Sequence, residues 1–357
     1  MRRALQPLLF IPMLLVASWR PVDAQTEIEI FPRAASLTVG GRLHTQLQMS
    51  SVDGAATDVA FRRARIRVDI EISDFLDVRL NPDFAGGETE LKDAWARLDF
   101  GDAFRLSMGQ FKRAFSIFEL SSSTDLPIVE RDGRIEGLSA CPGVGGACSF
   151  SRLTEKLRFD GRDQGLRVDG AAWDGRFSWL ATLTNGEGSN TGDVNDAKSI
   201  SWRVTWQTGS VRVGAFGAVQ DHEVPLEIGG TDTDWAEAGG VDVEVGTWRD
   251  GLHLIGAAVV GDNWLAGPGV DFTTVQLLGS HYTSLGGARI EGIEPLFRAS
   301  WTDTGTASED AGGLLLTPGV MLYFAGKNGV SFNMDTYTPR GAGDTEVSFK
   351  IQTYLYF

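Results

Sequence analysis

The chain has 357 residues, of which 44 are glycine and 10 are tryptophan, and 42% are hydrophobic. This composition suits many short strands joined by turns, with aromatic girdles, and argues against a helical protein. The net charge of −15 argues against a nucleic-acid-binding protein, which would show a basic surface.

Residues 1–24 read as a Sec-type signal peptide. Arg2 and Arg3 provide a positive start, and a short apolar stretch and a small-residue cleavage site follow them. A membrane anchor is the alternative, but the apolar stretch is shorter than the ~20 residues of a spanning helix, and Pro12 interrupts it. We therefore expect the exported protein to be residues 25–357, without a helical membrane span.

Strict alternation of apolar and polar residues begins near Phe61 and predicts four consecutive strands. In FRRARIRVDIEI the even positions from Ala64 to Ile72 are apolar, and the odd positions from Arg63 to Glu71 are charged. The segments LDVRLN, LKDAWARLDF and FRLSMG repeat this pattern. Each strand thus has an apolar face and an arginine-bearing face. A soluble sandwich would bury the apolar face, whereas a membrane barrel would turn it to lipid and enclose the arginines in an aqueous lumen.

Three segments resemble the phosphate-selective porin O and P family. They are FRRARIRVDI, then NPDFAGG with LKDAWARLDF, and above all MGQFKRAFSIFELSSSTDLPIVERDG, within residues 61–134. The resemblance implies an outer-membrane porin of a Gram-negative bacterium, an all-β transmembrane antiparallel barrel that passes small anions, inorganic phosphate in particular. It also implies a homotrimer as one possible assembly and no cofactor.

The rest of the chain continues the strand rhythm, and we expect about 16 strands of the length that a tilted membrane strand requires. Their expected starts are Leu37, Phe61, Leu76, Glu90, Phe104, Gln164, Phe177, Ala197, Val211, Trp235, Leu252, Phe272, Arg289, Gly313, Val330 and Asp344. Short turns alternate with longer loops, such as the one expected at His222 to Asp234. This alternation is typical of outer-membrane barrels, and an even number of strands would put both termini on the periplasmic side.

The long loops hold many of the acidic residues, as in GEGSNTGDVND, DHEVPLEIGGTDTD and TDTGTASED. Polar segments rich in glycine and aspartate are most simply solvated loops. Divalent cations that bridge the loops to lipopolysaccharide are a weaker alternative, since no loop has calcium-loop spacing. Without residues 1–24 the charge is −17, from 29 basic and 46 acidic residues (32 − 3 and 47 − 1). An anion channel would need these acids outside the lumen.

The longest connection runs from about Ala114 to Asp163, and its opening FSIFELSSSTDLP is too apolar for a purely solvated loop. On the family resemblance, residues 115–163 form the third loop of a porin, folded inward to narrow the lumen. A surface loop with its own small core is the alternative. The side chains expected at the constriction are Lys112, Arg113, Ser121, Ser122, Ser123, Arg131 and Arg134.

Cys141 and Cys148 lie in this loop as CPGVGGAC and are the only cysteines of the chain. In an exported protein, six intervening residues, three of them glycine, can close a small disulfide ring. A zinc site needs more ligands, and no histidine is near. We favour a disulfide that stiffens the loop.

The last strand, TEVSFKIQTYLYF, alternates and stops at Phe357. A terminal aromatic residue on such a strand resembles the sorting signal read by the outer-membrane barrel assembly machinery, although a chance edge strand is the alternative. Pairing with the first strand would remove the open edge. The other partners we expect are outer-membrane lipid, lipopolysaccharide and small anions.

A barrel of about 16 strands leaves an aqueous channel, so its inner face sets selectivity. The arginines expected to line the pore are Arg63, Arg65, Arg67, Arg79, Arg97 and Arg105. Arginine forks suit oxyanions such as phosphate. However, aspartates on neighbouring strands could pair with them, and rings of charge decide selectivity only when unpaired. Anion selectivity and a mixed or unselective pore both stay open.

Two other functional classes remain. A barrel enzyme is remote, because none of the four histidines lies beside a nucleophile motif such as G-x-S-x-G, and no catalytic or metal residues are predicted. A scaffold or adhesin that uses the acidic loops is the third reading, and a conductance measurement would separate it from a porin.

Overall fold

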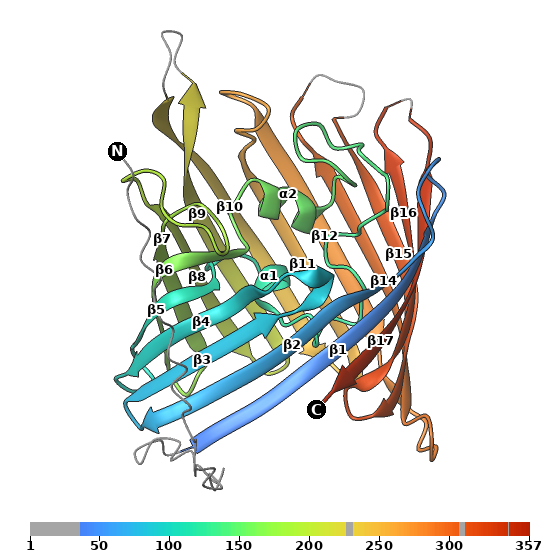
Figure 1. The fold of residues 1–357 in the computed structure, drawn as a ribbon, viewed down its shortest axis with the longest axis horizontal. Helices are drawn as coiled ribbons and strands as arrows, with labels where there is room; N and C mark the ends of the chain where they lie inside the picture. Colours follow the sequence, from blue (N-terminus) through green and yellow to red (C-terminus); the bar gives the residue numbers. More distant parts are fainter. Residues whose placement is uncertain (1–35, 226–230, 307–310, 342) are drawn as a thin grey trace, which may run out of the picture. The chain divides into compact units, whose positions relative to one another are not determined.

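Antiparallel strands close on themselves to form a barrel in the computed structural model, which describes residues 36–225, 231–306, 311–341 and 343–357. The expected signal peptide, residues 1–24, lies outside the described residues. The described residues belong to one unit, Ala34–Phe357. Each long strand pairs with the next long strand along the chain, and β1 pairs with both β2 and β17, so the described sheet has no open edge (Figure 1).

The sheet has 17 strands, of which β13 (Thr283–Ser284) has only two residues, so 16 long strands form the wall in the described part of the chain. These are β1 (Ser36–Ser50), β2 (Asp58–Ser73), β3 (Leu76–Asp83), β4 (Glu90–Asp99), β5 (Arg105–Lys112), β6 (Arg162–Ala172), β7 (Phe177–Thr184), β8 (Ser199–Thr208), β9 (Val211–Pro225), β10 (Thr231–Thr247), β11 (Asp250–Asp262), β12 (Asp271–His281), β14 (Gly292–Asp303), β15 (Gly312–Ala325), β16 (Asn328–Pro339) and β17 (Glu346–Tyr356). A short 3₁₀ turn, η1 (Ala85–Gly87), joins β3 to β4.

The predicted strands are confirmed, and each predicted start lies within four residues of the observed one. The expected loop from His222 to Asp234 is largely wrong, because β9 continues to Pro225 and β10 begins at Thr231. The alternating residues there pair in register, for example Thr233 with Glu223. Paired backbone groups satisfy their hydrogen bonds, so polar side chains at the rim do not end a strand.

The two faces of the wall differ as the alternation predicts. Val241 is 60% exposed, whereas the next residue, Asp242, is 5% exposed. Met108 and Ser107 show the same contrast on β5. Apolar side chains therefore cover the outside, and most inward-facing side chains of the wall are polar, which is the reverse of a soluble protein. Phe75, Phe100 and Phe104 form part of an exposed aromatic band beside the short turns, with ring centroids 5.0 and 5.6 Å apart.

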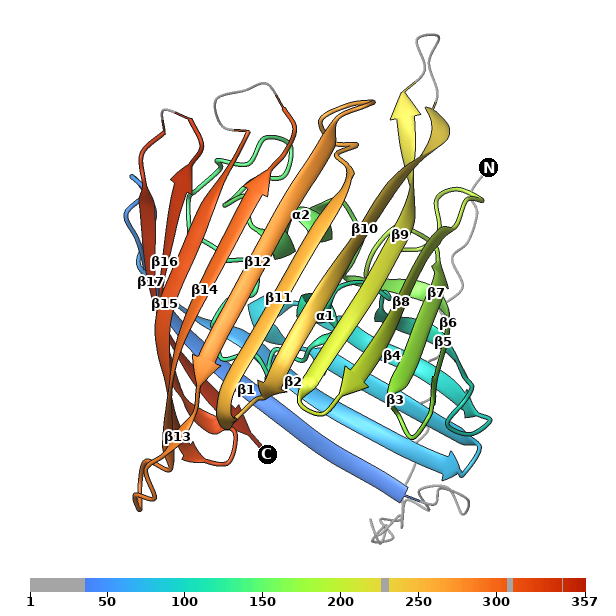
Figure 2. The same cartoon turned by 180° about the vertical axis from the view of Figure 1, so that it is seen from behind.

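The long connection between β5 and β6 lies inside the barrel, as predicted. Its two short helices, α1 (Ile117–Leu120) and α2 (Phe150–Lys156), lie within the ring of strands in both views (Figures 1 and 2). Its apolar side chains form one buried cluster with inward-facing residues of the wall, among them Phe216, Phe272 and Leu315. The inner face of β9 to β16 therefore buries the apolar side of the loop and does not face open water.

Candidate functional site

A β-bulge in β2 turns two neighbouring arginines into the lumen. His44 pairs with Arg63 and Thr45 pairs with Phe61, so Arg62 is an extra residue between them. Phe61 and Ile66 are both exposed, at 62% and 41%, although their positions have opposite parity. A bulge of this kind re-aims side chains. Without it, Arg62 would point outward with Ala64 and Ile66.

The two arginines have different partners. Arg62 donates two hydrogen bonds, of 2.5 and 2.9 Å, to the carboxylate of Glu130 in the long loop. Arg63 is buried beside the ring of His44, 3.4 Å from its Nδ1. Burial would raise the pKa of Glu130, but Arg62 and Arg63 hold it at about 2. Glu130 is therefore ionised at neutral pH and ties the loop to the wall.

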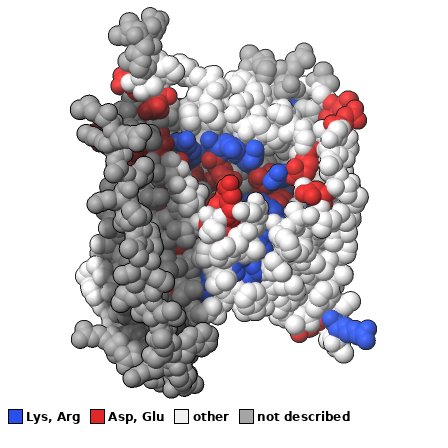
Figure 3. Space-filling view, viewed as in Figure 1, with Lys and Arg blue, Asp and Glu red and all other residues white. Residues whose placement is uncertain are grey.

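A cavity of about 500 Å³, here called the basic chamber, separates the loop from strands β1 to β7. Among the described residues its lining includes ten cationic side chains and two carboxylates, Asp93 and Asp169. The cations are Arg42, Arg63, Arg65, Arg67, Arg79, Arg97, Lys112, Arg131, Arg162 and Arg167. Figure 3 shows charged side chains gathered in the hollow at the middle of the view, with mostly uncharged residues around them.

Aspartates on adjacent strands pair with several of these arginines. The Nε atoms of Arg65, Arg79 and Arg97 donate to Asp83, Asp69 and Asp77 at 2.6, 2.6 and 2.9 Å. The hydrogen bonds of these three arginines to protein use Nε alone within the described residues. Since a guanidinium has five N–H donors, the four on the terminal nitrogens remain for solutes.

Arg42 and Arg63 carry the charge that is least compensated. Neither forms an ion pair with a carboxylate in the part of the chain that the structure describes, and Arg42 donates to Ser123 Oγ of the loop at 3.2 Å. Positive charge without a counter-charge attracts anions most strongly in a site that is partly shielded from water. This end of the chamber therefore has the strongest excess of positive charge.

The loop adds its own groups to the chamber. Arg131 pairs with Glu119 at 2.5 Å and donates to the backbone oxygen of Ser121 at 2.7 Å, and Lys112 also donates to that oxygen, at 3.0 Å. Burial would raise the pKa of Glu119, but Arg131 and Lys112 lower it, so this carboxylate stays ionised. The backbone after α1 is thus held by two cations, and Ser122 and Ser123 line the chamber.

The far wall anchors the loop through single polar side chains. Backbone N–H groups of the loop donate to Asp242, Asn333 and Ser300 at 3.0, 2.6 and 2.8 Å. Arg298 is fully buried and donates to the carbonyl oxygens of Glu130 and Arg131 at 2.8 and 2.7 Å. These contacts fix how far the loop stands from the arginines of the opposite wall.

The family model of the phosphate-selective porins O and P matches residues 37–225, more than half of the chain. The chain belongs to the phosphate-selective porin O and P family. It is an outer-membrane β-barrel porin. No curated protein matches it.

Solved structures with the same fold include three porins or channels. OmpF of Salmonella typhi, solved with daunomycin, is 12% identical, with a TM-score of 0.62 over 92% of this porin and 99% of that chain. The channel DcaP of Acinetobacter baumannii is 14% identical, with a TM-score of 0.60 over 92% and 99%. The anion-selective porin of Comamonas acidovorans is 13% identical, with a TM-score of 0.59 over 90% and 99%. At these identities the likeness shows the fold alone. No helix in the described ranges has the length and hydropathy to cross a bilayer.

Most of the residues predicted from the porin's sequence lie together. The basic chamber is lined by Arg63, Arg65, Arg67, Arg79, Arg97, Lys112, Ser122, Ser123 and Arg131. Arg105 and Ser121 line a second cavity of about 440 Å³, which shares Leu120, Arg167, Asp169 and Leu180 with the chamber. A third cavity, of about 460 Å³, shares Ser121, Gln207 and Arg212 with the second. The three cavities form a series toward the short turns.

Two expected constriction residues lie elsewhere. Arg113 is buried on the other side of the loop, where it donates to Gln220 and to the backbone oxygen of Arg158. Its position after β5 turns it toward β8 and β9, since its neighbour Ala114 donates to Ser201. Arg134 is half exposed and pairs with Glu136 at 2.5 Å. Neither side chain lines the chamber.

Sequence reasoning missed Arg42, Arg62 and Arg162. Arg42 shares the inward face of β1 with His44 and Gln46. This series of alternating polar residues could have predicted that Arg42 faces the lumen. Arg162 donates two hydrogen bonds, of 3.0 and 3.2 Å, to Asp93. Arg162 is the first residue of β6, two residues before the predicted start of that strand at Gln164, so the sequence prediction assigns it to the loop. The bulge at Arg62 has no signal in simple alternation.

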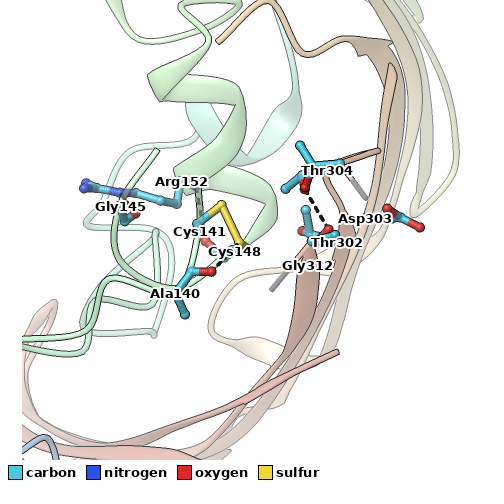
Figure 4. The surroundings of a disulfide bond; sticks show 12 residues. Ala140, Cys141, Gly145, Cys148, Arg152, Thr302, Asp303, Thr304 and Gly312 are labelled. Atoms are coloured by element: carbon cyan, nitrogen blue, oxygen red, sulfur yellow. Dashed lines mark hydrogen bonds between the residues drawn. A yellow bond between two sulfur atoms is a disulfide. The ribbon is translucent and has the colours of Figure 1, made fainter. Parts of the chain in front are cut away.

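A disulfide joins Cys141 and Cys148 in the porin's loop, and both residues are buried (Figure 4). Next to it, Arg152 of α2 donates from Nε to the backbone oxygen of Gly145 at 3.1 Å. The bond closes a turn that includes Gly143, Gly145 and Gly146, all with positive φ. Such a turn of flexible residues is stabilised by the cross-link.

Proposed function

We propose that this porin lets small anions, inorganic phosphate among them, diffuse passively across the outer membrane. The observation that carries the proposal is the lining of the basic chamber, with ten cationic side chains against two carboxylates among the described residues. Arginine suits oxyanions because its planar fork can bind two oxygens and keeps its charge at every relevant pH. The three cavities in series provide several weak sites, which conduction requires.

Mixed selectivity is the second candidate, and a specific observation favours it. Arg67 and Arg79 share Asp69, at 2.7 and 2.6 Å, and Arg97 pairs with Asp77 at 2.9 Å. These pairs lower the net positive charge of the wall. The proposal therefore depends on Arg42 and Arg63, whose charges lack such partners among the described residues.

The remaining features of the proposal concern topology and assembly. We place the short turns and both termini on the periplasmic side, and the longer loops outside, where they meet lipopolysaccharide. We propose that Phe357 is read by the barrel assembly machinery; its backbone pairs with Gly41 through bonds of 2.8 and 3.2 Å. A homotrimer is the proposed assembly, since OmpT of Vibrio cholerae, 13% identical with a TM-score of 0.56, has a trimer form. We assign no enzymatic activity.

Planar bilayer recordings test the function. In a potassium chloride gradient, we expect the reversal potential of the wild type to show preference for chloride, and added phosphate to reduce the chloride current. Substituting Arg42→Gln and Arg63→Gln together should move the reversal potential toward that of an unselective pore. Arg340→Gln removes a half-exposed arginine that pairs with Asp303 outside the chamber, and we expect it to change nothing. A wild-type channel that prefers potassium would refute the anion assignment and leave the barrel intact.

A further inference from the structure

The basic chamber also contains apolar surface, which a phosphate channel does not need. Its lining includes Trp95, Phe111, Leu120 and Leu180 beside the arginines. The inward face of β1 to β5 is otherwise polar or charged at most positions. Phosphate has no apolar part, so an indole in its path makes no favourable direct contact with it. The combination suits a solute that carries both negative charge and an apolar body.

Trp95 stands between two arginines of the chamber. It pairs directly with Arg79 of β3, and Arg97 follows it by two positions on the same face of β4. The guanidinium carbons of Arg79 and Arg97 lie 4.9 and 5.3 Å from the centroid of the indole ring, within cation–π range. A flat group that enters here meets an aromatic ring and the planes of two guanidinium groups, on which aromatic rings also stack.

Next to Trp95, the inner face of the wall has no side chains at two positions. The next two positions in register are Gly109 of β5 and Gly165 of β6, neither of which has a side chain. The backbone requires glycine at both, because an added Cβ would lie 2.2 Å from the carbonyl oxygen of Ala94 and 2.1 Å from that of Leu183. The indole is half-buried, so part of its surface is open to the chamber.

We propose that the basic chamber binds aromatic carboxylates, with benzoate as the simplest member, more strongly than acetate or phosphate. The ring of the solute lies against the open part of Trp95, and its carboxylate accepts hydrogen bonds, in the guanidinium planes, from the terminal nitrogens of Arg79 and Arg97, whose Nε atoms are engaged by aspartates. The chamber volume of about 500 Å³ is in the range of sites that enclose small organic ligands. The inference rests on the proposed conduction of anions and names one class of solute.

Trp95 has a plainer role as the alternative: it could hold Arg79 and Arg97 in place and never touch a solute. The two roles predict different results for Trp95→Leu. A residue that only positions the arginines affects every anion equally. A residue that also contacts the aromatic ring of the solute affects benzoate more than phosphate and acetate.

The experiment measures how much benzoate, acetate and phosphate are needed to halve the chloride current of single channels. In the wild type we expect benzoate to act at about tenfold lower concentration than acetate, in line with an aromatic contact plus buried ring surface. Trp95→Leu should bring benzoate to the level of acetate, and Trp95→Phe, which keeps a ring, should retain most of the preference. Trp202→Leu, on the exposed outer face, is the matched control.

Two results would overturn the inference: equal potency of benzoate and acetate in the wild type, or equal weakening of benzoate and phosphate by Trp95→Leu. Both differ from a failure of the proposed function, which appears in the reversal potential with potassium chloride alone. If Trp95→Leu does not assemble, the wild type and Trp95→Phe still decide the question through the ratio of benzoate to acetate.

Discussion

Removing the guanidinium of Arg298 is expected to release the loop while the barrel stays closed. Arg298 is fully buried, and it donates to the backbone oxygens of Glu130 and Arg131, to Thr317, and to Asp335 at 2.7 Å. In Arg298→Met, Asp335 keeps its other partners, Lys350 at 2.6 Å and the hydroxyl of Thr317. The loss therefore falls mainly on the two loop carbonyls.

The size of the effect follows from these contacts. A hydrogen bond from a charged donor contributes about 1.5 to 3 kcal/mol, so two of them contribute about 3 kcal/mol or more to loop docking. At 1.4 kcal/mol per factor of ten, the ratio of docked to undocked loop falls more than about a hundredfold. We expect larger and noisier single-channel currents, and faster protease cleavage within the loop, because the segment at Arg131 no longer holds one side of the basic chamber.

The assay compares Arg298→Met with Arg340→Met, which removes a half-exposed arginine paired with Asp303. Exposed pairs contribute about 0 to 1 kcal/mol, so the control should resemble the wild type. Heat-modified mobility in gels reports whether each barrel is closed. If Arg298→Met gives wild-type conductance, noise and protease resistance while its barrel is closed, the anchoring role assigned to Arg298 is wrong.

Three further predictions concern the same loop and wall. Because the folded pKa of Glu130 is lowered to about 2, its ion pair stabilises the docked loop above about pH 4.5 and weakens as the pH falls toward 2. Conductance should therefore be independent of pH near neutrality, and the current should become noisier in acid. Glu130→Gln should remove that acid response. Replacing Cys141 and Cys148 together by serine should destabilise the loop by about 2.5 kcal/mol, seen as faster trypsin cleavage with unchanged barrel mobility; equal cleavage rates would contradict this. Asp83→Asn removes the carboxylate 2.6 Å from Arg65, and we expect a higher chloride-to-potassium permeability ratio; a lower ratio would show that this arginine does not act on permeating ions.

Alternation alone predicts most of the wall, because the side-chain period of a strand is two and each face meets a different solvent. It fails where the backbone departs from that period. The bulge at Arg62 is the clearest case: Phe61 and Ile66 both face outward, and the arginine between them turns inward to Glu130. Nothing in the local residue types requires an extra residue at that point; its partner is 68 positions away.

The loop was predictable in its placement but not in its contacts. The apolar opening around Phe115 and Phe118 requires burial, and both side chains are fully buried inside the barrel. Which wall buries them depends on inward residues such as Phe216 and Phe272, which look like ordinary departures from alternation in the sequence. Arg113 could not be placed from the sequence for the same reason: its neighbour Ala114 docks on β8, which turns Arg113 away from the chamber.

The inner wall thus has two halves: one binds the loop, and the other carries the arginines that face the basic chamber. Strands β9 to β16 present Phe216, Ile255, Leu315 and small residues, and they hold the loop by apolar contact and by single polar anchors such as Asp242. Strands β1 to β7 carry the arginines and leave a basic chamber between themselves and the loop. The first half holds most of the loop's buried contacts, and Arg62 and Arg42 of the second half add ties to Glu130 and Ser123. The distance between the loop and the arginines is therefore set in part by side chains outside the chamber. Selectivity can therefore change through the anchors as well as through the arginines, and a variant of either kind is distinguished by its effect on current noise.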